Sequence, residues 1–167
     1  ALAQKKNNRT ENLLLVNPIT GEEYSASRGH GAVLNSRRVR TSEIKVPAKA
    51  ALATNLLDQA RQGDDPMIWG EMAAVLARDT AMFRTSGCVT LDIARVSAGL
   101  LDAAVIFRPQ AADFDLGVTL AMESGALTGD FSGNPAVGAA RQLVVANPKL
   151  FRELLKTLHP FRGRLPR

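Results

Sequence analysis

The pattern of hydrophobic and polar positions changes its period once along the chain, near residue 50. Before that point, residues 13–17 (LLLVN) and 22–27 (EEYSAS) form short apolar or alternating runs separated by a Gly-centred turn. Residues 29–42 (GHGAVLNSRRVRTS) continue without helical spacing, and Gly29 and Gly31 indicate a tight turn or bulge. This pattern is typical of antiparallel strands, so a β-rich first segment is predicted.

After residue 50, short apolar runs alternate with stretches of helical spacing. Strands are predicted in residues 50–57, 102–107 and 142–147, and a strand followed by a turn in each of 80–87 and 126–134. Helices are predicted from Pro66 with Asp65 as N-cap, from Cys88 to a Gly99 cap, from Asp113 to Gly125, and from Pro148.

The alternation predicts an α/β fold, with a partial antiparallel sheet followed by a mostly parallel sheet flanked by helices. A boundary is expected near residues 41–49. It would divide a β-rich piece (residues 1–45) from a C-terminal α/β domain (residues 46–167).

Composition narrows the function classes. The chain has 167 residues, a net charge of +5 and two basic clusters, at residues 36–40 and 159–167. Such an excess fits nucleic acid, a membrane surface or an anionic substrate, but the aromatic content is 5% and no RNA-binding signature is present, which favours a simple charged surface. The single cysteine, Cys88, excludes an internal disulfide and indicates a reducing compartment, so a cytoplasmic location is expected. No apolar stretch reaches the length of a membrane span, so no membrane association is expected. The chain starts as if within a strand, so we expect upstream residues to belong to it.

Two aspartates, Asp113 and Asp115, mark the junction between the strand predicted at 102–107 and the helix after it. Ligands of open α/β sheets collect where strands end and helices begin. An Asp there can cap the helix by accepting a backbone N–H, or it can bind a hard cation such as Mg²⁺. The residues alone leave both roles open for Asp113, and make Asp115 a partner of the helix dipole.

Several motifs around this junction occur in a familiar order. The stretches DFDLG (113–117), ESG (123–125) and DFSG (130–133) resemble the C-terminal signature of the inositol monophosphatase family. Residues 22–35, 83–103 and 143–155 also resemble segments of that family, in the same order. The similarity covers nearly the whole chain and is nearest to the bacterial extragenic-suppressor type.

The resemblance implies a layered αβαβα sandwich that hydrolyses phosphate monoesters with Mg²⁺. It assigns Asp113 as a metal ligand, and places Gly87 and Cys88 beside the substrate, an inositol phosphate or a related sugar or nucleotide phosphate. It also implies a homodimer.

The departures from the family pattern are specific. The family's Asp-Pro-x-Asp-Gly-Thr loop and a further Glu, which supply most metal ligands, do not occur in these 167 residues. Ala112 replaces the family's Trp, Cys88 its Ser, and Ile106 the acid that contacts a sugar hydroxyl. Because one carboxylate cannot hold two or three Mg²⁺ ions, the chain is expected to be inactive by itself.

Two alternatives to an incomplete phosphomonoesterase stay open. One is a family member that has lost catalysis and acts as a regulatory module that binds RNA or RNA polymerase. The other is an α/β domain that only dimerises.

Other polar residues have simpler interpretations. No His lies near Cys88 in the sequence, so Cys88 is expected to be a structural thiol. Arg84 is expected to form a salt bridge at the end of a strand. Glu123 and Asp92 are expected to be structural, and His30 to lie at the surface.

Overall fold

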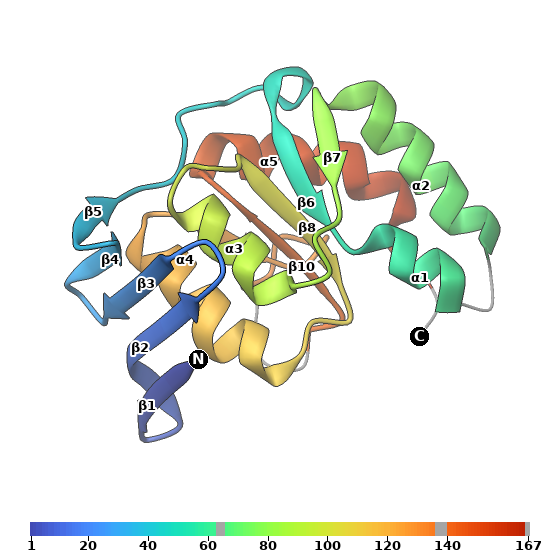
Figure 1. Cartoon of the computed structure of the whole chain (residues 1–167). Helices are drawn as coiled ribbons and strands as arrows, with labels where there is room; N and C mark the ends of the chain where they lie inside the picture. Colours follow the sequence, from blue (N-terminus) through green and yellow to red (C-terminus); the bar gives the residue numbers. More distant parts are fainter. Residues whose placement is uncertain (63–65, 136–139, 166–167) are drawn as a thin grey trace.

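The computed structural model describes residues 1–62, 66–135 and 140–165. The helix predicted from Pro66 is present, but its predicted N-cap, Asp65, lies outside the described residues. Two five-stranded sheets and the helices between and behind them build the fold (Figure 1). The predicted α/β class is therefore confirmed.

The first sheet is antiparallel throughout, as predicted, with its strands in chain order. Two-residue turns at Asn7–Asn8 and Asn35–Ser36, all with positive φ, connect the outer hairpins, which suits the right-handed twist of paired strands. Leu13 opposes Ala26, which opposes Ala32, so one face of the sheet is apolar and buried. Its strands are β1 (Leu2–Lys6), β2 (Arg9–Asn17), β3 (Glu22–Ser27), β4 (Gly31–Leu34) and β5 (Arg37–Val39).

The second sheet is mixed, where the sequence predicted a mostly parallel one. Its strands are β6 (Ala51–Thr54), β7 (Met82–Arg84), β8 (Ala103–Phe107), β9 (Leu127–Gly129) and β10 (Gln142–Ala146), in the order β7-β6-β8-β10-β9. Only β6 pairs in parallel, with β7 and β8; β10 runs antiparallel to both of its neighbours. Two parallel strands must be joined by a crossover connection, which is usually a helix. No helix is described between β9 and β10. Strand β10 instead runs back antiparallel to β9 and lies between β9 and β8.

Helices follow most of the predicted positions. They are α1 (Leu56–Gln62), α2 (Pro66–Asp79), α3 (Val89–Ser97), the π-helical η2 (Asp113–Val118), α4 (Thr119–Glu123) and α5 (Pro148–Leu158), with short 3-10 turns η1 (Pro47–Lys49) and η3 (His159–Phe161). One boundary was wrong: the run predicted as a strand to residue 57 ends at Thr54, and Leu56 already begins α1. At α5 the Asn147 side chain caps the helix, accepting N–H bonds from Lys149 and Leu150.

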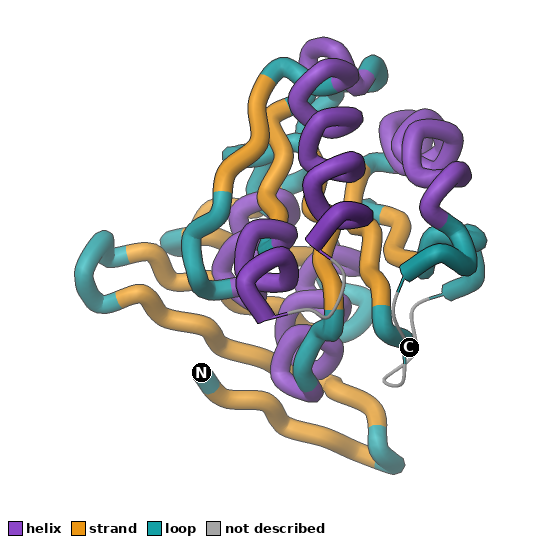
Figure 2. Tube along the Cα trace, turned by 90° about the vertical axis from the view of Figure 1, so that its right-hand side faces the viewer, coloured by secondary structure: helices purple, strands orange, loops and turns teal. Residues whose placement is uncertain are grey.

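The elements stack as sheet, helices, sheet and helices, and Figure 2 shows them from the right-hand side of Figure 1. The apolar face of the first sheet packs on α3, η2 and α4, around Tyr24, Ala94 and Leu120. The same helices cover one face of the second sheet, and α1, α2 and α5 cover its other face around Trp69 and Phe107. Both sheets pack on the same layer of helices, α3, η2 and α4. The predicted division into two domains at residue 45 therefore stays a prediction.

Candidate active-site corner

The parallel strands of the second sheet end at one edge, and three elements begin there: α1 after β6, α3 after β7 and η2 after β8 (Figure 1). Asn55 ties two of these ends together, because its side chain accepts the Phe107 N–H and donates to the Phe107 carbonyl, both at 2.8 Å. The Thr85 hydroxyl donates to the Thr54 carbonyl at 2.8 Å and holds the loop before α3 against β6. The corner predicted from the sequence is therefore present and fixed by hydrogen bonds.

Asp113 lies buried in this corner, with 4% of its surface exposed. Its Oδ1 accepts a 2.6 Å hydrogen bond from the Thr90 hydroxyl of α3, and its Oδ2 accepts the Gln110 backbone N–H at 2.8 Å. The Gln110 carbonyl in turn accepts the N–H groups of Asp113 and Phe114. The bond from the Gln110 N–H is one half of a capping box, in which a side chain in the first turn reaches back to the residue that starts the helix. The other half is absent, because the Gln110 side chain donates to the Arg108 carbonyl at 3.1 Å.

The turn at Gly87 and Cys88 leads into α3 and meets Asp113 through Thr90, which lies in the first turn of that helix. Gly87 has φ +82°, a left-handed conformation that glycine adopts without strain. Cys88 is exposed, makes no capping bond with its side chain, and donates its N–H to the Ser86 hydroxyl at 3.1 Å. The structure thus brings the three predicted site residues to one corner.

Asp92 lies in the first turn of α3, and its N–H donates to the Cys88 carbonyl at 3.0 Å. It is 2% exposed, and its Oδ1 has no hydrogen-bond partner among the described residues. Burial raises the pKa of the Asp92 carboxyl group, and nearby Ser86 and the charges of Arg84 and Arg95 act in the opposite direction. The sequence marked Asp92 as a packing residue, and its burial agrees.

Two of the departures from the family pattern have a clear structural position. Ile106 is fully buried in the cluster between α3 and the second sheet, so its side chain faces the core and not a ligand. Ala112 is exposed one residue before Asp113.

The residues present do not by themselves fit a Mg²⁺ ion. Mg²⁺ demands near-octahedral oxygen coordination, and at this corner the chain offers the Asp113 carboxylate, whose oxygens are both already bonded. The neighbouring Asp115 is paired with Lys5 at 2.6 Å. Within residues 1–62, 66–135 and 140–165, no three His, Cys, Asp or Glu side chains lie together as a metal-binding group. Metal binding by Asp113 therefore stays a prediction that needs ligands from beyond the described part.

Glu123 is structural, as predicted, but with a sharper role than the sequence indicates. Its two carboxylate oxygens accept the backbone N–H groups of Gly29 and Gly31, each at 2.9 Å. The carboxylate thus joins the end of α4 to the β3–β4 turn, 92 and 94 residues away in the sequence.

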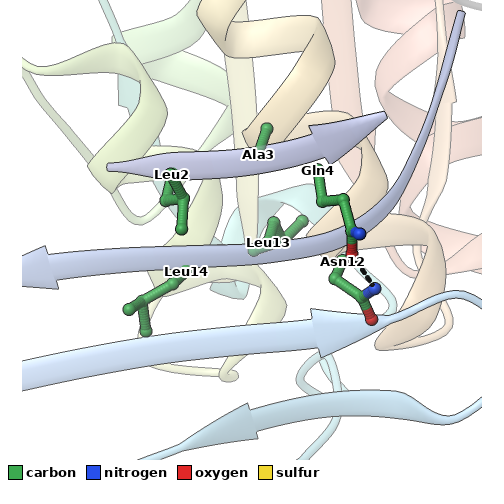
Figure 3. Close-up of a pocket in the computed structure, with 6 residues that line it drawn as sticks. All are labelled: Leu2, Ala3, Gln4, Asn12, Leu13 and Leu14. Carbon is green, nitrogen blue, oxygen red and sulfur yellow. Dashed lines mark hydrogen bonds between the residues drawn. The ribbon is translucent and has the colours of Figure 1, made fainter. Parts of the chain in front are cut away.

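A separate hollow of about 500 Å³ lies between β1 and β2, away from the predicted site residues (Figure 3). Figure 3 shows Leu2 and Leu14 on one side of the strand pair and Ala3 on the other, with Gln4 accepting a 2.6 Å bond from Asn12 at one end. None of the three predicted site residues lines it.

Comparison with known proteins decides the family. Residues 13–161 match the family described as the inositol monophosphatase family, which is most of the chain. The chain belongs to the inositol monophosphatase family. This confirms the resemblance drawn from the motifs around Asp113.

Relatives and solved structures of this family agree. The chain is 36% identical over 160 residues to the Nus factor SuhB of Pseudomonas aeruginosa, and 30% identical over 158 residues to that of Escherichia coli. These alignments cover 96% and 95% of this chain but 59% and 58% of the two relatives, so the chain spans less than two thirds of their length.

Among solved structures, an inositol monophosphatase of Thermotoga maritima has a TM-score of 0.83 at 24% identity, covering 97% of this chain and 61% of its own. The extragenic suppressor protein SuhB of Bartonella henselae gives 0.82 at 23% identity, covering 93% and 59%. At these identities the two structures establish the fold alone. No helix in the described part of the chain combines the length and apolar character needed to cross a membrane.

Proposed function

We propose that this chain forms one side of a phosphomonoesterase site whose substrate is an inositol phosphate or a related sugar or nucleotide phosphate. The observation that supports it most is the Thr90–Asp113 hydrogen bond, which brings the Gly87–Cys88 turn and the Asp113 corner together at the carboxyl edge of the parallel strands. Family membership supports the reaction class.

In this proposal the Gly87–Cys88 turn faces the substrate. The turn is exposed and leads into α3, and the N-terminal end of a helix favours a negatively charged group such as phosphate. The Mg²⁺ that the family implies would be held mainly by ligands from outside these 167 residues. Asp113 lies beside that site and accepts one hydrogen bond on each oxygen, from Thr90 and from Gln110.

The test is phosphate release by a hybrid protein in which this chain replaces the matching 160 residues of Pseudomonas aeruginosa SuhB. With inositol monophosphate and Mg²⁺, the hybrid is expected to release phosphate. Cys88→Glu in the hybrid should raise KM about tenfold or more, because a carboxylate would then face the phosphate, whereas Cys88→Ser should leave KM within twofold. Equal KM values for the two variants would show that the Gly87–Cys88 turn does not face the substrate.

A second candidate is a regulatory role in transcription without hydrolysis. It is favoured by the name Nus factor that the relatives at 36% and 30% identity carry, and by the net charge of +5. RNA polymerase or RNA would then be the partner. The test is binding of each to this chain at increasing salt: RNA binding should weaken steeply as phosphate contacts are screened, and an affinity that stays flat contradicts the RNA form of this role.

A homodimer and a cytoplasmic location remain part of the proposal. Light scattering on the purified chain tests the first, with a mass twice the 17.9 kDa of one chain as the expected result.

A further inference from the structure

The bonding of Asp113 points to a role that differs from the one its family position implies. We propose that Thr90 closes the Asp113 corner, so that in this chain the carboxylate is a structural acceptor and takes up no Mg²⁺. The proposal does not depend on whether the completed protein hydrolyses phosphate esters.

The first step concerns the oxygens. The Thr90 bond to Oδ1 is 2.6 Å long and the Gln110 bond to Oδ2 is 2.8 Å, both in the range of hydrogen bonds to a charged acceptor. Such bonds contribute more than neutral ones, so both oxygens are held in place by donors of this chain.

The second step concerns burial. Asp113, the first residue of η2, is 4% exposed and is bonded to Thr90 of α3. A Mg²⁺ ion gives up its hydration shell reluctantly, so it enters such a buried position at a cost. A buried carboxylate with a donor on each oxygen is satisfied, whereas without Thr90 its Oδ1 would be buried with no donor.

The third step concerns the neighbours. Gly117, one turn after Asp113, packs so tightly against Ile93 of α3 that a Cβ there would lie 2.9 Å from Ile93 Cδ1. This contact holds η2 and α3 together next to the Thr90–Asp113 pair. Widening the corner for an ion would have to separate the two helices.

The experiment is thermal unfolding of this 167-residue chain in EDTA and in millimolar Mg²⁺. Thr90→Val keeps the shape and removes the donor, Thr90→Ser keeps the donor, and Asp113→Asn removes one acceptor. Thr90→Val and Asp113→Asn should each lower Tm by about 3–8 °C in EDTA, and the double variant by less than the sum. Thr90→Ser should stay within about 2 °C of the wild type. Asp115→Asn is the matched control, since that carboxylate lies on the same turn and pairs at the surface with Lys5; its effect should be small.

Millimolar Mg²⁺ should leave the Tm of the wild-type chain unchanged. A Tm that Mg²⁺ raises in the wild type but not in Asp113→Asn would overturn the proposal, and so would an Asp113→Asn chain that is as stable as the wild type. If Asp113→Asn fails to fold, the difference between Thr90→Val and Thr90→Ser decides. An inactive hybrid with these Tm losses present would refute the hydrolase proposal and leave this one standing.

Discussion

Arg95 of α3 and Glu22 of β3 join the first sheet to the helices beneath it through two hydrogen bonds, at 2.9 and 3.2 Å. Both side chains are mostly buried, with 17% and 15% exposed. The Glu22 carboxylate also accepts the hydroxyls of Thr20 at 2.7 Å and Tyr24 at 2.9 Å. The first sheet is therefore attached to the rest of the chain by a satisfied charge network as well as by its apolar face.

This network predicts an acid-sensitive interface. The Arg95 hydrogen bond is the main cause that lowers the pKa of Glu22 from 4.5 to about 2, against the opposing effect of burial. A lowered pKa means that the stabilisation is present above pH 4.5 and is lost as the pH falls toward 2. Glu22→Gln should lower Tm at pH 7 by on the order of 5 °C and flatten the fall of Tm between pH 4.5 and 2.

Glu11→Gln is the matched control for Glu22, because Glu11 is paired more loosely with Arg28, at 3.6 Å. Its curve of Tm against pH should follow that of the wild type. If Glu22→Gln loses Tm with acid as steeply as the wild type does, another group is responsible.

The Glu123 carboxylate should contribute measurably to stability. Glu123→Gln leaves one acceptor for the two N–H groups of Gly29 and Gly31, so one of them would face an amide NH₂. We expect a loss of about 1–2 kcal/mol in the free energy of unfolding, measured with urea. Glu153→Gln, which removes an exposed pair with Lys156 on α5, should change it by less than about 0.5 kcal/mol. Equal effects of the two changes would contradict the bridging role of Glu123.

Gly117 should tolerate no side chain. Gly117→Ala places a Cβ 2.9 Å from Ile93 Cδ1 and 3.2 Å from Ile93 Cβ, so it should cost about 1–3 kcal/mol in urea unfolding. Gly70→Ala is the opposite control: a Cβ at this position in α2 meets nothing within 4 Å, so the change should stabilise by about 0.5–1 kcal/mol through helix propensity. A neutral Gly117→Ala chain would show that η2 and α3 are less closely packed than described.

Arg108 carries backbone strain at the end of β8. Its φ of +47° is unfavourable for a residue with a Cβ, although its N–H keeps a 2.7 Å bond to the Arg141 carbonyl. Arg108→Gly should keep that bond and raise the free energy of unfolding by about 1 kcal/mol. A loss of stability instead would mean that the Arg108 side chain makes a stabilising contact that outweighs the strain.

The corner itself could be predicted because it is local in sequence. Apolar residues 102–107 followed by Asp113 and helical spacing mark the end of a strand and the start of a helix, and this fixes the region where a ligand would lie. The antiparallel first sheet followed from the same kind of local pattern.

What could not be predicted depends on tertiary contacts. Whether Asp113 caps its helix or faces a ligand depends on Thr90, 23 residues earlier, and no local pattern indicates that pair. The direction of β10 depends on the connection from β9, which an apolar run does not specify. The end of β6 at Thr54 depends on where α1 begins, and the apolar run of residues 50–57 does not mark that boundary.

The central claim is that these residues form one side of a phosphomonoesterase site and cannot complete it alone. It is tested most directly by measuring inorganic phosphate released from inositol monophosphate with Mg²⁺, comparing the 167-residue chain, the hybrid with Pseudomonas aeruginosa SuhB, and the parent SuhB. We predict no release by the chain and Mg²⁺-dependent release by the hybrid. Release by the chain alone, or an active parent with a folded but inactive hybrid, would contradict the account.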